Sequence, residues 1–179
     1  INGASNGDSA GSTVSELGDV NGDSLADLLV WSPGASTNSG RAYVVFGKTD
    51  NAVVNLTAVA GGTGGFAING NTTNLSGYST VSGAGDINGD GLMDFIIGMP
   101  MTSTEAGAAY VVFGKTGGQA LDLSSVATGQ GGFLIKGAQG KTGIGVSAAG
   151  DINGDGFADL LVSASEANIN PSVSGTAEG

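Results

Sequence analysis

Short blocks of apolar residues alternate with Gly, Asn, Asp and Ser along the whole chain. Blocks of this kind, bounded by turn-forming residues, are typical of β-strands. No stretch of ten or more residues shows a convincing helical period, so the pattern predicts an all-β fold. Three blocks are continuous apolar runs, which indicates strands buried on both faces of a sheet. They lie at Leu28–Val30, Phe95–Ile97 and Leu160–Val162.

The blocks belong to a long repeat. The phrase Tyr43-Val-Val-Phe-Gly-Lys48 returns at 110–115, and Ile1-Asn2-Gly3 returns at 68–70, both with an offset of 67 residues. We therefore interpret the chain as a single array with three units. These are repeat 1 (1–67), repeat 2 (68–134) and a truncated repeat 3 (135–179).

Each complete repeat is expected to hold four short antiparallel strands. In repeat 2 they are placed at Tyr78–Ala84, Phe95–Met99, Ala108–Gly114 and Gly132–Gly137. The first strand is made almost entirely of small residues, which suits a place where several repeats converge. Its counterparts are Ser12–Leu17 and Gly143–Ala149. A turn of helix is expected between the third and fourth strands, at Val53–Val59 and Leu121–Val126.

Four-stranded sheets repeated at this interval indicate the blades of a β-propeller. One such sheet cannot bury both faces alone, so neighbouring blades must cover it. A linear β-solenoid is the alternative, but its rungs are usually much shorter. The chain supplies about 2.7 blades where propellers need about 4 to 8. We therefore expect an incomplete propeller, completed by remaining blades or by other copies of the chain.

The charge of the chain narrows the class of partner. The chain has 16 acidic residues, 5 basic residues and no histidine, which gives a net charge of −11. Cations rather than nucleic acid are therefore the expected partners. Cysteine is absent, and no apolar run reaches the length of a membrane span, so neither disulfides nor a membrane span is expected. The chain begins Ile-Asn-Gly without an initiator Met or a signal peptide, which we interpret as a mature product or a fragment.

Nine of the sixteen acidic residues stand in three loops that link the first and second strands of the repeats. Each loop has Asp at positions 1, 5 and 9, Asn at position 3 and an apolar residue at position 7. Loop 1 is Asp19-Val-Asn21-Gly-Asp23-Ser-Leu25-Ala-Asp27, loop 2 is Asp86-Ile-Asn88-Gly-Asp90-Gly-Leu92-Met-Asp94, and loop 3 is Asp151-Ile-Asn153-Gly-Asp155-Gly-Phe157-Ala-Asp159.

This spacing predicts one Ca²⁺ site per loop. Alternate oxygens on a curled loop converge on one point, and Ca²⁺ takes about 6 to 8 oxygen ligands. The ligands expected are the side chains at positions 1, 3, 5 and 9, the backbone carbonyl at position 7, and water. Two carboxylates about 5 Å apart repel by roughly 3 kcal/mol at an effective dielectric near 20, so a cation accounts for their clustering.

Alternatives to calcium account for the loops less well. The preference of Asp, Asn and Gly for turns could account for one such loop, but not for three copies at matching positions of the repeats. Mg²⁺ demands stricter octahedral geometry, and zinc lacks its usual Cys and His ligands. An EF-hand requires Glu at position 12 and flanking helices, whereas position 12 is Val30, Ile97 and Val162.

Loop 1 differs from the other two at position 6. Ser24 stands where the others have Gly91 and Gly156. A position that favours positive φ is costlier for Ser than for Gly. We therefore expect loop 1 to bind calcium least tightly of the three.

In combination these features resemble the FG-GAP repeats of integrin α-subunit propellers and their bacterial secreted relatives. The shared pattern is a small-residue strand, a Gly-Asp-(Val/Ile)-Asn-Gly-Asp loop, an apolar strand, a Gly-Ala-Pro-like corner and Gly-(Arg/Ala)-Ala-Tyr-Val-Val-Phe-Gly. The corner departs from the motif, reading Trp31-Ser-Pro33, Gly98-Met-Pro100 and Ser163-Ala-Ser165. The third copy has neither Gly nor Pro there.

The resemblance implies a closed seven-bladed ring, secretion to the extracellular space or cell surface, and a role in cell adhesion or recognition. It also implies that Ca²⁺ has a structural role, bracing these loops, and that the calcium loops are not the ligand-binding site. Contacts with a protein or carbohydrate ligand would instead lie on Ala35–Gly40 and Met101–Gly107. The alternative functions are a structural subunit of a self-assembling surface layer or filament and, less favoured, a non-catalytic part of a secreted enzyme.

Catalysis by this chain is not expected. It has neither His nor Cys, and assigning nine Asp residues to metal leaves few groups for general acid–base chemistry. Trp31, the only tryptophan, could stack on a sugar, but an aromatic beside an apolar strand is more often packed in the core.

Overall fold

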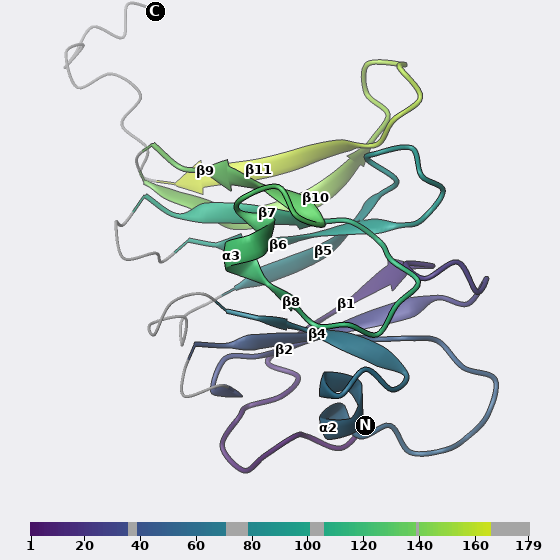
Figure 1. Ribbon diagram of the computed structural model, residues 1–179. Coiled ribbons are helices and arrows are strands. Elements are labelled where there is room, and N and C mark those ends of the chain that lie inside the picture. The colour runs from purple at the N-terminus through teal and green to yellow at the C-terminus, as the bar shows by residue number, and fades with distance from the viewer. Residues whose placement is uncertain (36–38, 71–78, 101–105, 139, 166–179) are drawn as a thin grey trace, which may run out of the picture.

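The computed structural model describes residues 1–35, 39–70, 79–100, 106–138 and 140–165. Its strands form three sheets that lie one above another (Figure 1). Within each repeat the strands run antiparallel to their neighbours, as the sequence predicts. The stack is an open arrangement of propeller blades, so an incomplete propeller is confirmed.

The first sheet contains β1 (Thr13–Gly18), β2 (Asp27–Ser32), β3 (Arg41–Val45), β4 (Gly65–Asn69) and β8 (Leu121–Asp122) in that order. The second contains β5 (Thr80–Gly85), β6 (Asp94–Met99), β7 (Ala108–Val112) and β9 (Gly132–Lys136). The third contains β10 (Lys141–Gly150) and β11 (Asp159–Ser165). Blade 1 therefore runs from β1 to β4 and crosses the 67/68 boundary, because the repeat counted from Ile1 is a circular permutation of the structural blade.

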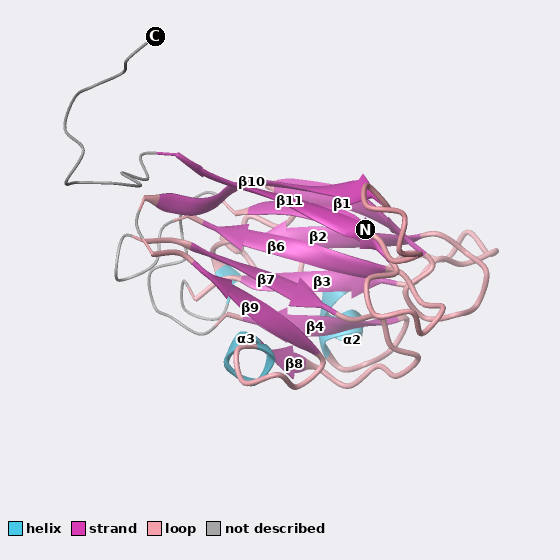
Figure 2. Ribbon diagram, turned by 90° about the horizontal axis from the view of Figure 1, so that it is seen from above, coloured by secondary structure: helices cyan, strands magenta, loops and turns pink. Residues whose placement is uncertain are grey.

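Two short helices confirm the helical turns expected between third and fourth strands. They are α2 (Leu56–Ala60) and α3 (Leu123–Val126). Each buries one Leu and one Val, Leu56 with Val59 and Leu123 with Val126. Figure 2 shows both helices on the side of the fourth strands β4 and β9, opposite the first strands β1 and β10. No helix in the described residues has both the length and the apolar character needed to cross a membrane.

The main core lies between the first and second sheets. Successive side chains of a strand point to opposite faces, so Leu29 and Trp31 of β2 face the second sheet while Val30 packs under α2. From the other side, Phe95 and Ile97 of β6 enter the same core. Trp31 is only 1% exposed, which confirms packing rather than a place on the surface for a sugar.

The first strands of successive blades pack against one another, as their small residues suggest. Thr80 Oγ donates a hydrogen bond to the backbone oxygen of Gly143 at 2.9 Å, which joins β5 to β10. A Cβ added to Gly83 would lie 3.2 Å from the backbone oxygen of Glu16 in β1. Larger residues at these positions would push neighbouring blades apart.

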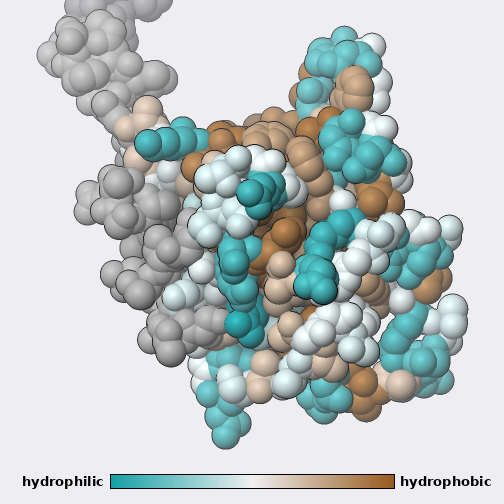
Figure 3. Space-filling model, in the orientation of Figure 1, coloured by the Kyte–Doolittle hydropathy of each residue, from teal (hydrophilic) through white to brown (hydrophobic). Residues whose placement is uncertain are grey.

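Two sequence predictions need correction. The third strand of blade 2 ends at Val112 rather than Gly114, because the N–H of Gly114 turns away to the side chain of Asp94 at 2.8 Å. Two of the apolar runs are not buried on both faces. Leu161 in the run Leu160–Val162 is 59% exposed, since β10 is the only strand partner of β11 in the described residues, and Leu28 in the run Leu28–Val30 is 43% exposed near the start of β2. Figure 3 shows apolar surface along the upper edge of the molecule, where β11 lies in Figure 1.

The fourth strand of one blade is held by the next repeat. Ile68 and Asn69 of β4 pair in parallel with Leu121 and Asp122 of β8, and Asn69 Nδ2 donates to Asp122 Oδ1 at 2.9 Å. The equivalent contact occurs one repeat earlier, where Asn2 and Asn55 form a parallel β-bridge and Asn2 Nδ2 donates to Asn55 Oδ1 at 2.9 Å. The sequence pattern predicted only a helical turn at Leu121–Val126 and not this strand.

Candidate metal centre

The three acidic loops each connect the first and second strands of one sheet. Loop 1 joins β1 to β2, loop 2 joins β5 to β6 and loop 3 joins β10 to β11. They project from the same side of the molecule, one above another (Figure 1). The repeated acidic residues therefore gather along one edge of the stack.

The carboxylate at position 1 organises the backbone of its loop. In loop 2, Asp86 Oδ1 accepts hydrogen bonds from the N–H groups of Gly89 at 2.7 Å and Asp90 at 3.2 Å, and Oδ2 accepts one from Gly91 at 2.9 Å. Position 1 of the other two loops accepts the same three bonds at 2.7 to 3.1 Å. Three separate sequences thus fold into one loop conformation.

Positions 3, 5 and 7 are joined by a second set of bonds. Asn88 Oδ1 accepts from the N–H of Asp90, and Asn88 Nδ2 donates to Asp90 Oδ2, both at 2.9 Å. Asp90 Oδ1 in turn accepts from the N–H of Leu92 at 2.9 Å. Loops 1 and 3 repeat these contacts at 2.8 to 3.0 Å. The predicted ligands at positions 1, 3 and 5 therefore lie on one tight curl.

The carboxylate at position 9 lies under the loop. Asp94 is fully buried; its Oδ2 accepts from the N–H of Ile87 at 2.9 Å and its Oδ1 from Gly114 at 2.8 Å. Asp27 is buried in the same way and accepts from Val20 and Gly47 at 2.8 and 2.7 Å. In loops 1 and 2, position 9 thus ties the start of the loop to the end of the third strand. Asp159 of loop 3 is half-buried and accepts from the N–H of Ile152 at 2.7 Å.

The acidic side chains influence one another's ionisation. Burial raises the pKa of Asp94 above 3.8, two backbone hydrogen bonds oppose this, and the charges of Asp90 and Asp86 raise it further. The pKa of Asp27 is raised by burial and by its own loop's carboxylates in the same way. Desolvation also acts to raise the pKa of Asp19, but four backbone N–H bonds outweigh it and lower that pKa. A bound cation would relieve the repulsion felt at position 9.

Position 6 requires the backbone conformation that the sequence predicts. Gly91 and Gly156 have φ of 87° and 91°, and Ser24 has φ of 69°. A residue with a Cβ pays a steric cost in this left-handed region. The conformational part of the prediction for loop 1 is confirmed, while its weaker calcium affinity stays a prediction.

The donor set of each loop fits calcium, although the ligands are not gathered. Within the ranges that the structure describes, no three Asp, Glu, His or Cys side chains converge as a metal-binding group. The carboxylates instead direct their oxygens at backbone N–H groups. In loop 2, Oδ1 of Asp86 accepts two hydrogen bonds, whereas its Oδ2 and the side-chain oxygens at positions 3, 5 and 9 accept one each and have a second lone pair for a metal. An all-oxygen set of carboxylates, an amide and carbonyls is what Ca²⁺ prefers.

Two glycines belong to the site and were missed by the sequence analysis. A Cβ added to Gly47 would lie 2.6 Å from both the backbone oxygen of Ala26 and Cβ of Leu25. At Gly114 it would lie 2.6 Å from Cβ of Leu92. The third strand can therefore reach the buried carboxylate at position 9 only through glycine. The repeated Phe-Gly-Lys phrase was the available signal.

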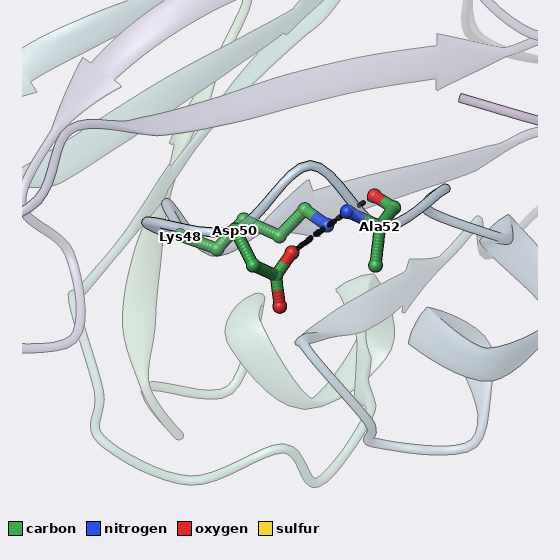
Figure 4. Close-up of polar contacts among 3 residues, drawn as sticks. All are labelled: Lys48, Asp50 and Ala52. Atoms are coloured by element: carbon green, nitrogen blue, oxygen red, sulfur yellow. Dashed lines mark hydrogen bonds and ion pairs between the residues drawn. The ribbon is translucent and has the colours of Figure 1, made fainter.

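The Lys that follows each of these glycines fixes the next turn. Lys48 Nζ bonds Asp50 Oδ1 at 2.5 Å and also the backbone oxygen of Ala52 (Figure 4). Lys115 bonds backbone oxygens in the equivalent turn and lies 4.2 Å from the ring centre of Phe66 in blade 1. The segment after the third strand thus contacts the turn that follows it and, in blade 2, also the preceding blade.

The proposed ligand-contact segments Ala35–Gly40 and Met101–Gly107 fall mostly outside the described residues. The structure places Ala35, Ser39, Gly40, Ala106 and Gly107. A protein or carbohydrate partner at these segments stays a prediction.

Known proteins resemble this chain through its repeats. The FG-GAP repeat model matches residues 10–45, 77–112 and 142–177. Integrin alpha-PS5 of Drosophila melanogaster is 31% identical over 160 residues, which cover 82% of this chain and 14% of that protein. Integrin alpha-4 of Xenopus laevis is 30% identical over 156 residues, covering 82% of this chain and 13% of that protein. The chain thus spans a small part of the length of these relatives, and by its three repeats it belongs to the FG-GAP repeat family.

Proposed function

We propose that the chain is a calcium-binding β-propeller module with an adhesion or recognition role, placed outside the cell or at its surface. Similarity to two integrin α-chains supports the role and the location. The acidic loops support the metal. In this proposal Ca²⁺ stabilises each blade from within, and the recognition surface lies elsewhere on the module.

The observation that carries the proposal is the identical organisation of the three loops. Every loop presents two carboxylates and one amide oxygen on the same hydrogen-bonded curl, with a third carboxylate at position 9 that accepts from the N–H of position 2. A turn that served only to reverse the chain would not need three acidic side chains. Their mutual repulsion, felt at Asp27 and Asp94, is a cost that a divalent cation removes.

Each predicted ligand has a structural role of its own. Position 1 orders the backbone, positions 3 and 5 hold each other, and in loops 1 and 2 position 9 connects the loop to the end of the third strand. The carbonyls of Leu25, Leu92 and Phe157 complete the predicted set. Bound Ca²⁺ supplies positive charge and fixed coordination at the point where the first and second strands separate, and so couples metal binding to folding.

Native mass spectrometry with and without a chelator tests the metal directly. The unaltered chain should carry three calcium ions, and one ion should be lost from each of Asp23→Asn, Asp90→Asn and Asp155→Asn. Asp50→Asn is the matched control, because it removes the same charge from an exposed residue outside the loops. Retention of three ions by the loop variants, or no metal on the unaltered chain, would contradict the proposal.

A structural subunit of a surface layer or filament is the second candidate. It is favoured by large apolar side chains exposed on both outer blades, including Leu28 at 43% and Leu161 at 59%. Light scattering of the purified chain during calcium addition separates the two functions. Growth into long assemblies supports the subunit, whereas a constant mass supports the recognition module.

A further inference from the structure

Consecutive acidic loops are in direct contact. The N–H of Met93, at position 8 of loop 2, donates to the backbone oxygen of Asp19, at position 1 of loop 1, at 2.9 Å. The N–H of Ala158 in loop 3 donates to the backbone oxygen of Asp86 in loop 2 at 3.2 Å. The same two positions are therefore joined at both junctions between loops.

Side chains reinforce each junction. Position 7 of one loop lies on the position 4 glycine of the loop before it. A Cβ added to Gly22 would lie 3.2 Å from Cδ2 of Leu92, and one added to Gly89 would lie 2.7 Å from Cε1 of Phe157. At the first junction the N–H of Lys115 also donates to the backbone oxygen of Val20 at 2.8 Å. Each loop is thus held in part by its predecessor.

The bond from position 8 acts on a predicted calcium ligand. The N–H of Met93 and the carbonyl of Leu92 belong to one planar peptide group and point in opposite directions. Fixing the N–H on loop 1 therefore fixes the direction of the carbonyl that loop 2 offers to its ion. At the other end of the bond stands Asp19, whose side chain is the position 1 ligand of loop 1.

We propose that calcium binding in consecutive loops is coupled through the peptide groups Leu92–Met93 and Phe157–Ala158, so that an ion in one loop raises the affinity of its neighbours. The inference rests on the proposed calcium function. Coupling of this kind is reciprocal, so each of two adjacent loops strengthens the other by the same factor. It should also decline with distance along the series, because loops 1 and 3 meet only through loop 2.

Electrostatics opposes this coupling and provides a way to recognise it. An ion in one loop makes the neighbourhood less negative and so weakens attraction of the next cation. Mobile ions screen that effect over about 8 Å at 0.15 M salt, whereas a hydrogen-bonded peptide group is not screened. Positive coupling between loops should therefore persist or increase as salt is raised.

Site-resolved calcium titration by NMR tests the proposal. The amides of Gly91 and Gly156 are suitable probes, since each donates to the position 1 carboxylate of its own loop at 2.9 Å. Asp23→Asn, which weakens loop 1, should lower the calcium affinity of loop 2 about fivefold or more and that of loop 3 less. Asp50→Asn, the control of equal charge, should leave both unchanged.

Leu92→Ala provides a second test that keeps every predicted ligand, because position 7 contributes only its carbonyl. It should reduce the effect of Asp23→Asn on loop 2. Affinity of loop 2 that is the same in Asp23→Asn as in the unaltered chain would overturn the coupling. If the unaltered chain binds three ions independently, only the coupling fails; if it binds none, the proposed function fails as well.

Discussion

Gly114 stands where the third strand of blade 2 meets two acidic loops, and replacing it with Ala tests that junction. The new Cβ would lie 2.6 Å from Cβ of Leu92, 2.8 Å from the oxygen of Met93 and 2.9 Å from the oxygen of Val20. Two of these three atoms belong to backbone, so the chain itself must shift. The shift would pull the N–H of Gly114 away from the buried carboxylate of Asp94.

The size of the effect follows from these contacts. Overpacking costs about 1 to 3 kcal/mol, and a buried acceptor that loses its donor costs about 1 to 3 kcal/mol. Reduced freedom of the unfolded chain returns about 0.4 to 1 kcal/mol. We expect a net loss of about 1 to 5 kcal/mol, which lowers Tm by about 2 to 20 °C in a chain of this length.

Gly117→Ala is the matched control, three residues further along. A Cβ at Gly117 would meet no atom within 4 Å, so this variant should be neutral or slightly stabilising. Thermal unfolding followed by circular dichroism compares the two variants under the same calcium concentration. Equal Tm values would refute the close approach of the third strand to the loops.

Three further outcomes are expected. Chelation should lower the free energy of unfolding by about 2.7 kcal/mol for each site that had been held at a hundred times its Kd, measured by calorimetry with and without calcium. Asp94→Asn should destabilise the chain by about 2 to 4 kcal/mol even in chelator, because an amide N–H₂ would face a backbone donor; Asp90→Asn, in the exposed part of the same loop, should cost far less without calcium. Ser24→Gly should raise stability by about 0.5 to 1 kcal/mol in urea titration and bring the calcium affinity of loop 1 closer to that of loop 2, since φ at this position is 69°.

The blade could be predicted from the sequence because its signals are local. The apolar run in β6 and the small residues of β5 each determine their own strand and its place in the sheet. The curl of each loop is equally local, since positions 1, 3 and 5 bond within nine residues. Spacing in the chain is enough to specify such contacts.

What the sequence analysis missed lies between blades. The two-residue strand β8 exists only because β4 of the preceding blade offers a free edge. Gly114 looks like an ordinary turn residue until Leu92 and Val20 are seen beside it. The bond from Met93 to Asp19 spans 74 residues and depends on the distance between sheets, which no local pattern encodes.

The parallel pairing of a fourth strand with the following repeat has a consequence for how such arrays change in length. Asn2 with Asn55 and Asn69 with Asp122 occupy equivalent places, each pair separated by 53 residues. A newly duplicated unit would therefore carry the residues that pair with the fourth strand of the unit before it. The number of units can then change without a new interface between blades, and selection acts on the loops of units that already pack together.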